Sequence, residues 1–128
     1  ELFHGYTYSG HPLACAAGLA TLDVYKEDGL FERALSLSDY WENVAHSLKG
    51  FPYVKDIRNL GLIAGIELES RKDKPGARAN DVFAHCYDEG ILVRVTGDTI
   101  ALSPPLIIEK NEINRLFETI GEVLKKVE

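Results

Sequence analysis

The stretch YVKDIRNLGLIAGIELES, Tyr53 to Ser70, decides the fold, because the spacing of apolar residues changes there from helical to alternating. It predicts two extended segments joined around Asn59 to Gly61. In the second segment every other residue is apolar, which places the following side chains on one face of a strand: Leu62, Ala64, Ile66 and Leu68. We therefore expect a small sheet in the middle of the chain.

Two helices are predicted before this sheet. The first has Pro12 in its first turn, Ser9 or His11 as its cap, and an end at Asp28-Gly29. Its surface is apolar nearly all round, which fits either a contact outside this domain or ordinary core packing. The second helix ends before Gly50 and carries one apolar stripe at helical spacing: Leu30, Ala34, Leu37, Trp41, Val44 and Leu48.

Four further elements are predicted after the sheet has begun. A polar loop, RKDKPG, leads to a helix from Ala79 to Glu89, with Val82, Phe83 and Cys86 facing inward. Two short strands, ILVRV and TIALS, follow on either side of a turn at Thr96-Gly97-Asp98, and a last helix runs from about Lys110 to Val127. The order α-α-β-β-α-β-β-α predicts an α+β fold, in which helices cover a small mixed or antiparallel sheet.

Composition argues against several classes of partner. The net charge is -6, with 20 acidic and 14 basic residues, which is unsuited to nucleic-acid binding. No apolar run approaches the roughly 18 residues of a membrane span. The four histidines (His4, His11, His46 and His85) lack metal-ligand spacing. Two distant cysteines, Cys15 and Cys86, suit reduced thiols in the cytoplasm. We expect no nucleic acid, membrane or metal partner.

The stretch FHGYTYSGHPLACAAG, Phe3 to Gly18, is the first candidate site. It is a glycine-flanked loop that leads into a helix N-terminus, where free N–H groups favour an anion such as phosphate. Thr7 and Ser9 add hydroxyl donors. A capped helix behind a tight turn is the alternative interpretation.

Arg94 is the second candidate, because it interrupts the apolar strand ILVRV. It alternates with Ile91, Val93 and Val95 and shares a face with Leu92. A guanidinium here could bind a carboxylate through two hydrogen bonds. It could equally be an arginine on an edge strand that extends into solvent.

Three motifs resemble class III pyridoxal-phosphate-dependent aminotransferases. They are FHGYTYSGHPLACAAGLA, which is similar to the segment after the catalytic lysine of that family, NLGLIAGIEL, and GILVRVTGDTIALSPPLII. The resemblance is strongest to the omega-amino acid:pyruvate (beta-alanine:pyruvate) branch. Ornithine-type and aminomutase relatives usually have asparagine where this chain has His11.

This resemblance implies a C-terminal fragment of a larger cytoplasmic enzyme that is a homodimer or homotetramer. Residues 1–28 would lead from the large cofactor-binding domain, and residues 29–128 would form the C-terminal small domain of a fold-type I enzyme. The implied reaction moves an amino group from an omega-amino acid or amine to pyruvate. Two alternatives remain: another class III enzyme (a decarboxylase, aminomutase or epimerase), or a non-catalytic, free-standing interaction domain.

The resemblance also assigns roles to the two candidates. Thr7 matches the threonine that donates to the phosphate of the neighbouring subunit's pyridoxal 5'-phosphate. Arg94 matches a mobile arginine that pairs with the substrate carboxylate. The Schiff-base lysine would lie upstream of Glu1, so we expect no catalytic residue in this chain. The 128 residues alone are expected to be inactive and not to bind the cofactor.

Overall fold

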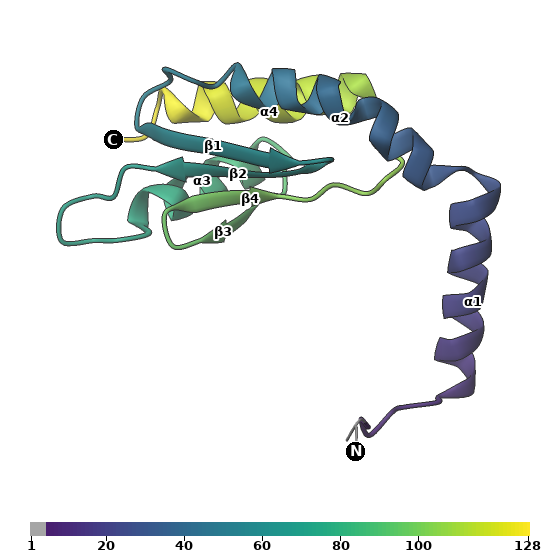
Figure 1. Ribbon diagram of the computed structural model, residues 1–128. Helices are drawn as coiled ribbons and strands as arrows, with labels where there is room; N and C mark the ends of the chain where they lie inside the picture. Colours follow the sequence, from purple (N-terminus) through teal and green to yellow (C-terminus); the bar gives the residue numbers. More distant parts are fainter. Residues whose placement is uncertain (1–4) are drawn as a thin grey trace.

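The computed structural model describes residues 5–128, so Phe3 and His4 of the first motif lie outside the described residues. The helices are α1 (Pro12–Glu27), α2 (Leu30–His46), α3 (Ala77–Asp88) and α4 (Lys110–Leu124). The strands are β1 (Val54–Leu60), β2 (Ile63–Leu68), β3 (Arg94–Thr96) and β4 (Thr99–Leu102) (Figure 1). This order confirms the predicted α-α-β-β-α-β-β-α sequence of elements.

The four strands form one antiparallel sheet in the order β1-β2-β4-β3. The turn between β1 and β2 comes later than predicted, because β1 continues through Leu60, which pairs with Ile63. The hairpin of β3 and β4 turns at Gly97 and Asp98, within the predicted segment. The strand β3 therefore lies at one edge of the sheet, with β4 as its neighbour.

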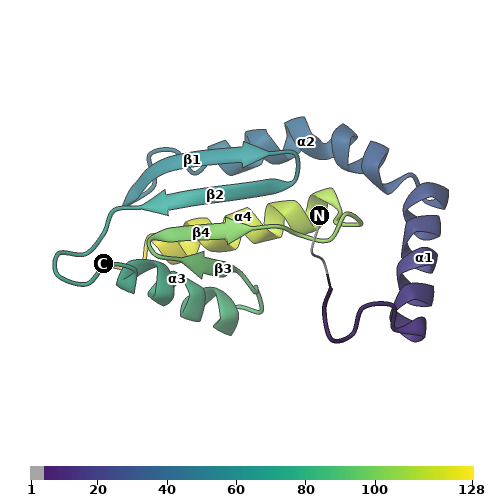
Figure 2. The same ribbon diagram turned by 60° about the horizontal axis from the view of Figure 1, so that its bottom comes forward.

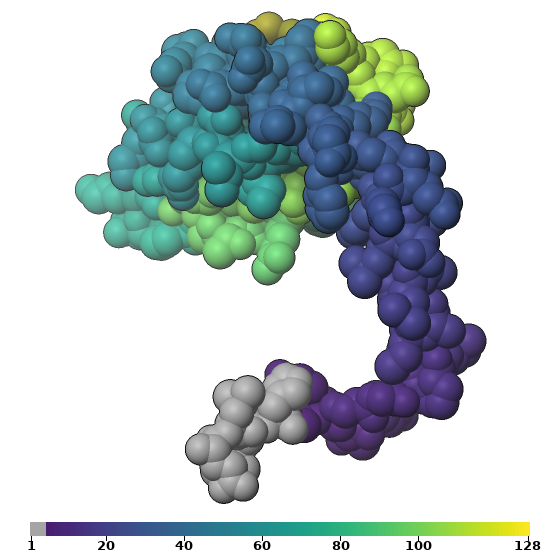
Figure 3. All heavy atoms as spheres, turned by 45° about the vertical axis from the view of Figure 1, so that its right-hand side comes forward, coloured from purple at the N-terminus to yellow at the C-terminus, as the bar shows by residue number. Residues whose placement is uncertain are grey.

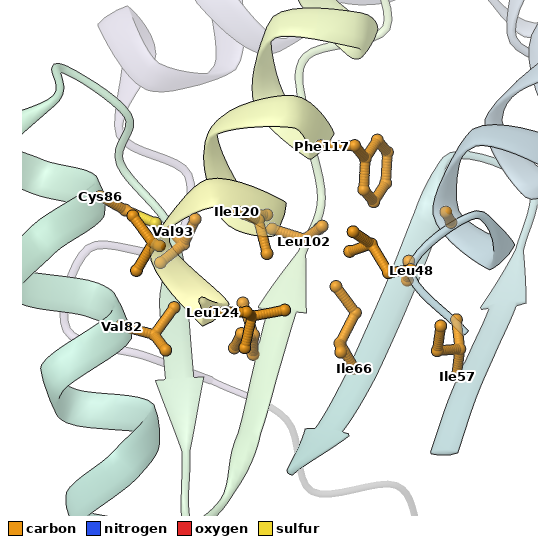
Figure 4. Packing of buried hydrophobic residues seen from close by; sticks show 14 of the residues in the cluster. Leu48, Ile57, Ile66, Val82, Cys86, Val93, Leu102, Phe117, Ile120 and Leu124 are labelled. Atoms are coloured by element: carbon orange, nitrogen blue, oxygen red, sulfur yellow. The ribbon is translucent and has the colours of Figure 1, made fainter. Parts of the chain in front are cut away.

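The core lies between one face of the sheet and a layer formed by α2, α3 and α4 (Figures 1 and 4). The predicted alternation in and before β2 is confirmed, because all four side chains are buried: Leu62, Ala64, Ile66 and Leu68. Trp41 of α2 meets Phe117 of α4 edge to face, with 4.9 Å between ring centroids. In α3, Val82 and Cys86 are fully buried as predicted, while Phe83 is half-buried.

Helix α1 stands away from this core as an arm (Figures 1 and 3). Its bounds are those that the sequence predicts, and its cap is His11, whose Nδ1 accepts a hydrogen bond from the Ala14 N–H at 3.3 Å. None of its residues is buried, and its large apolar side chains are exposed: Leu13, Leu19, Leu22 and Val24. In residues 5–128, ordinary core packing therefore does not account for its apolar surface.

Helices α2 and α4 are joined by one part-buried hydrogen bond, which gives a test of the packing. The Tyr40 hydroxyl donates to Asn114 Oδ1 at 2.6 Å. Tyr40→Phe keeps the ring, and with it the Lys110 ammonium above it, but removes this bond, so we expect the free energy of unfolding to fall by about 1 kcal/mol. Urea unfolding followed by Trp41 fluorescence measures the change.

Ser36→Ala is the matched control for Tyr40→Phe. Its exposed hydroxyl donates to the Arg33 carbonyl within the same helix, α2, so the stability should change by less than about 0.5 kcal/mol. Equal losses in the two variants would contradict a specific contribution from the bond between α2 and α4.

Candidate functional site

Thr7 lies in an exposed turn just ahead of α1. The turn is held by its neighbours: the Ser9 N–H donates to the Tyr6 carbonyl at 3.0 Å, and the Tyr6 N–H donates to Ser9 Oγ at 2.8 Å. Within residues 5–128, no group is hydrogen-bonded to the Thr7 hydroxyl, which is thus free to donate to a ligand.

The start of α1 fits one contact to a phosphate rather than a complete phosphate site. His11 already occupies the Ala14 N–H, which reduces the number of helix N–H groups that could bind an anion. The Thr7 hydroxyl is one of the donors that remain here, on an open surface. This arrangement suits the cofactor phosphate that the resemblance implies, provided that the other donors come from elsewhere.

Arg94 is the first residue of β3 and pairs across the hairpin with Ala101 of β4. The predicted alternation is confirmed by its flanking residues: Leu92 is 77% exposed, while Val93 is 4% exposed. The Arg94 side chain is exposed and makes no ion pair with any residue in the described part of the chain. Its guanidinium is thus unpaired, as both interpretations of this residue require.

A pocket of about 1020 Å³ opens beside Arg94. Its walls come from α3, β3, β4, the loop after β4 and α4, and most of them are apolar, including Phe83, Leu92, Val93, Pro104 and Leu116. Among the lining residues within 5–128, Arg94 is the only basic residue and Glu112 the only acidic one. The pocket can therefore accept an apolar chain with Arg94 available to a carboxylate.

The structure does not bring the two predicted residues together. Thr7 lies in the turn ahead of α1, and Arg94 is the first residue of β3, while α1 extends away from the rest of the molecule (Figure 3). The turned ribbon shows the same separation between the arm and β3 (Figure 2). In residues 5–128, each is one part of a site and not the whole of it.

Two polar residues, Arg78 of α3 and Asp98 in the hairpin turn, have no predicted role. Arg78 is 7% exposed, lies 3.7 Å from the Tyr53 ring centroid and donates to the carbonyls of Glu69 and Glu128. Asp98 binds the segment before α3. The predicted helix began at Ala79 instead of Ala77, which left Arg78 outside it, and Asp98 was treated only as a turn residue.

No group of three or more His, Cys, Asp or Glu side chains in residues 5–128 could hold a metal ion. His4 lies outside this range. In the same residues, no helix combines the length and the apolar character that crossing a bilayer requires.

The fold and the motifs agree with a single family. The profile described as Aminotransferase class-III matches residues 1–124, and the chain belongs to this family, whose members are pyridoxal-phosphate enzymes. The chain is 64% identical over 128 residues to an omega-aminotransferase from Caulobacter vibrioides, covering 100% of this chain and 29% of that protein. It is 39% identical over 127 residues to a beta-alanine--pyruvate aminotransferase from Pseudomonas aeruginosa, covering 99% and 28%.

Solved structures support the same fold. A thermostable omega transaminase from Pseudomonas jessenii superposes with a TM-score of 0.88 at 30% identity, covering 98% of this chain and 29% of that one. An adenosylmethionine-8-amino-7-oxononanoate aminotransferase from Methanocaldococcus jannaschii superposes with a TM-score of 0.85 at 31% identity. The match covers 100% of this chain and 31% of that one. The predicted family and α+β fold are confirmed. The chain spans less than a third of the length of these relatives, and the roles of Thr7 and Arg94 stay predictions.

Proposed function

We propose that this chain is part of a transaminase that moves an amino group from an omega-amino acid or amine to pyruvate. The observation that carries the proposal is the unpaired guanidinium of Arg94 beside a mostly apolar pocket. A planar guanidinium binds a carboxylate through two parallel hydrogen bonds, and the apolar wall accepts the rest of a small acid. Pyruvate and an omega-amino acid each carry such a carboxylate.

The position of Arg94 at the sheet edge suits substrates with a carboxylate and substrates without one. Its side chain is exposed and has no ion pair in residues 5–128, so no bond to the described residues has to break for it to move. It would bind a carboxylate when one is present and turn into solvent when the donor is a simple amine. One pocket would thereby serve an amine and a keto acid in turn.

Pyridoxal 5'-phosphate, when bound, supplies the electron sink that amino-group transfer needs. In this chain Thr7 would donate a hydrogen bond to its phosphate. The remaining contacts would come from polypeptide outside residues 1–128, in a cytoplasmic homodimer or homotetramer. The exposed apolar surface of α1 supports such a neighbour, with residues 1–28 leading into the small domain formed by residues 29–128.

A chimeric enzyme tests the proposal. In it, this chain replaces the matching 29% of the Caulobacter vibrioides omega-aminotransferase, to which it is 64% identical. We expect the chimera to form alanine from pyruvate with beta-alanine or a simple amine as donor. The same enzyme truncated before this segment is the control and should form none. A folded, cofactor-loaded chimera that decarboxylates or epimerises amino acids, and forms no alanine, would overturn the proposal in favour of another class III reaction.

Thr7 gives a separate prediction on cofactor binding. Thr7→Val removes the hydroxyl while keeping a branched side chain, so a charge-assisted hydrogen bond to the phosphate is lost. We expect the Kd of the chimera for pyridoxal 5'-phosphate to rise about tenfold in an equilibrium absorbance titration. Thr7→Ser keeps the donor and should bind nearly as tightly as the unchanged chimera. Equal weakening in both variants would count against the hydrogen bond.

A further inference from the structure

We propose that Asp98 is a positioning residue for Arg94: its carboxylate fixes the β3–β4 hairpin to the segment before α3, and this sets where the guanidinium meets a substrate carboxylate. The inference rests on the proposed role of Arg94 and adds a residue that acts through it. Asp98 lies in the turn between the two strands and does not line the pocket.

Three hydrogen bonds join the hairpin turn to its neighbours. Asp98 Oδ1 accepts from the Gly76 N–H at 2.8 Å, and Oδ2 accepts from the Ser70 hydroxyl. The Asp98 carbonyl accepts from the Leu68 N–H at 2.9 Å. The donors span the end of β2 and the loop up to α3, so one residue connects the turn to two different segments.

The backbone shape around Asp98 supports a close, specific fit. Gly76 has φ of 78° and Gly97 has φ of 56°, in the region that favours glycine. A Cβ atom added at Gly76 would lie 3.3 Å from the Gly97 carbonyl oxygen, so the loop and the turn approach each other at backbone distance. The Ser70 hydroxyl and the Gly76 N–H lower the pKa of Asp98, which keeps the accepting carboxylate ionised.

The strand that carries Arg94 is short, and it is held by β4 on one side and by packing of α3 and the core against Val93 and Val95. It has three residues, and β4 is its strand neighbour at the sheet edge. Arg94 lies three residues before Gly97, which is about 10 Å along a strand. Over that length, a rotation of the turn by about 6° moves Arg94 by about 1 Å, and such displacements are large enough to weaken a bidentate contact. Fixing the turn therefore adds to the pairing with Ala101 in setting the place of the guanidinium.

The experiment compares two donors in single-turnover half-reactions of the chimera: beta-alanine, which carries a carboxylate, and a simple arylalkyl amine, which does not. Asp98→Ala removes both side-chain bonds, and we expect kcat/KM for beta-alanine to fall about tenfold while that for the amine stays within about twofold. Asp98→Asn should recover most of the loss, because its amide oxygen can accept from Gly76 and its amide N–H can donate to Ser70 Oγ.

A double variant separates positioning from general stability. If Asp98 acts through Arg94, adding Asp98→Ala to Arg94→Ala should cause no further loss with beta-alanine. A further tenfold loss in the double variant, or equal losses for both donors in Asp98→Ala alone, would overturn the inference. Should Asp98→Ala fail to fold, Ser70→Ala removes one of the two side-chain bonds. It should lower kcat/KM for beta-alanine by a smaller factor and again leave the value for the amine nearly unchanged.

The same data distinguish the two proposals. If Arg94→Ala itself affects both donors equally, the proposed role of Arg94 is wrong and the inference fails with it. If Arg94→Ala affects only beta-alanine and Asp98→Ala affects neither donor selectively, the role of Arg94 stands and only the inference about Asp98 is wrong.

Discussion

Arg94→Ala in the chimera is expected to lower kcat/KM for beta-alanine about a hundredfold and to leave a simple amine within about threefold. Removing the guanidinium leaves a substrate carboxylate in a mostly apolar pocket, where Glu112 is the only charged lining residue left among residues 5–128. That carboxylate loses a bidentate partner and gains none, whereas an uncharged substituent loses nothing. Single-turnover kinetics with each donor measures the difference between the two.

Two variants serve as controls for Arg94→Ala. Arg94→Lys keeps the charge but not the planar pair of donors. Its kcat/KM for beta-alanine should therefore lie between the values of the unchanged chimera and of Arg94→Ala. Arg115→Ala removes the same charge from an exposed position on α4 that does not line the pocket. It should leave kcat/KM unchanged for both donors. A comparable loss with both donors in Arg94→Ala would mean that Arg94 supports the fold and does not bind the carboxylate.

The elements were predictable where a single local signal fixes them. Pro12 and Asp28-Gly29 delimit α1, and period-two burial identifies β2. The strand around Arg94 was predicted too long, from Ile91, because the Ile91 N–H donates to the Cys86 carbonyl at 2.8 Å. That bond extends the end of α3, so the chain enters β3 only at Arg94.

The candidate site was predictable only as separate residues. Alternation places Arg94 on the exposed face of its strand, and the structure agrees. It does not indicate which loops meet, and Asp98 joins Ser70 and Gly76, which are 28 and 22 positions away in the chain. Composition likewise left open whether α1 packs inside this domain. Its exposed apolar side chains answer that question for the described residues.

The second large effect concerns the 128-residue chain by itself, which we expect to form no alanine from pyruvate and an amine donor in an overnight assay with added pyridoxal 5'-phosphate. The chemistry needs a lysine that holds the cofactor and moves a proton. Among residues 5–128, neither a lysine nor Thr7 lines the pocket beside Arg94. Within residues 5–128, the pocket beside Arg94 therefore has no lysine that could act as the base.

The measurement needs a soluble, folded chain, since the exposed apolar side chains of α1 favour aggregation. Size-exclusion chromatography and circular dichroism establish this before the assay, and the chimera, assayed under the same conditions, shows that the reagents support turnover.

Alanine formation by the chain above a cofactor-only blank would contradict the prediction. It would require a lysine of this chain to act on the cofactor, so replacing the lysines one at a time, beginning with Lys26 of α1 and Lys110 at the start of α4, would then identify it. Background transamination by free pyridoxal 5'-phosphate is subtracted with the blank, so a null result means that these 128 residues do not catalyse the transfer by themselves.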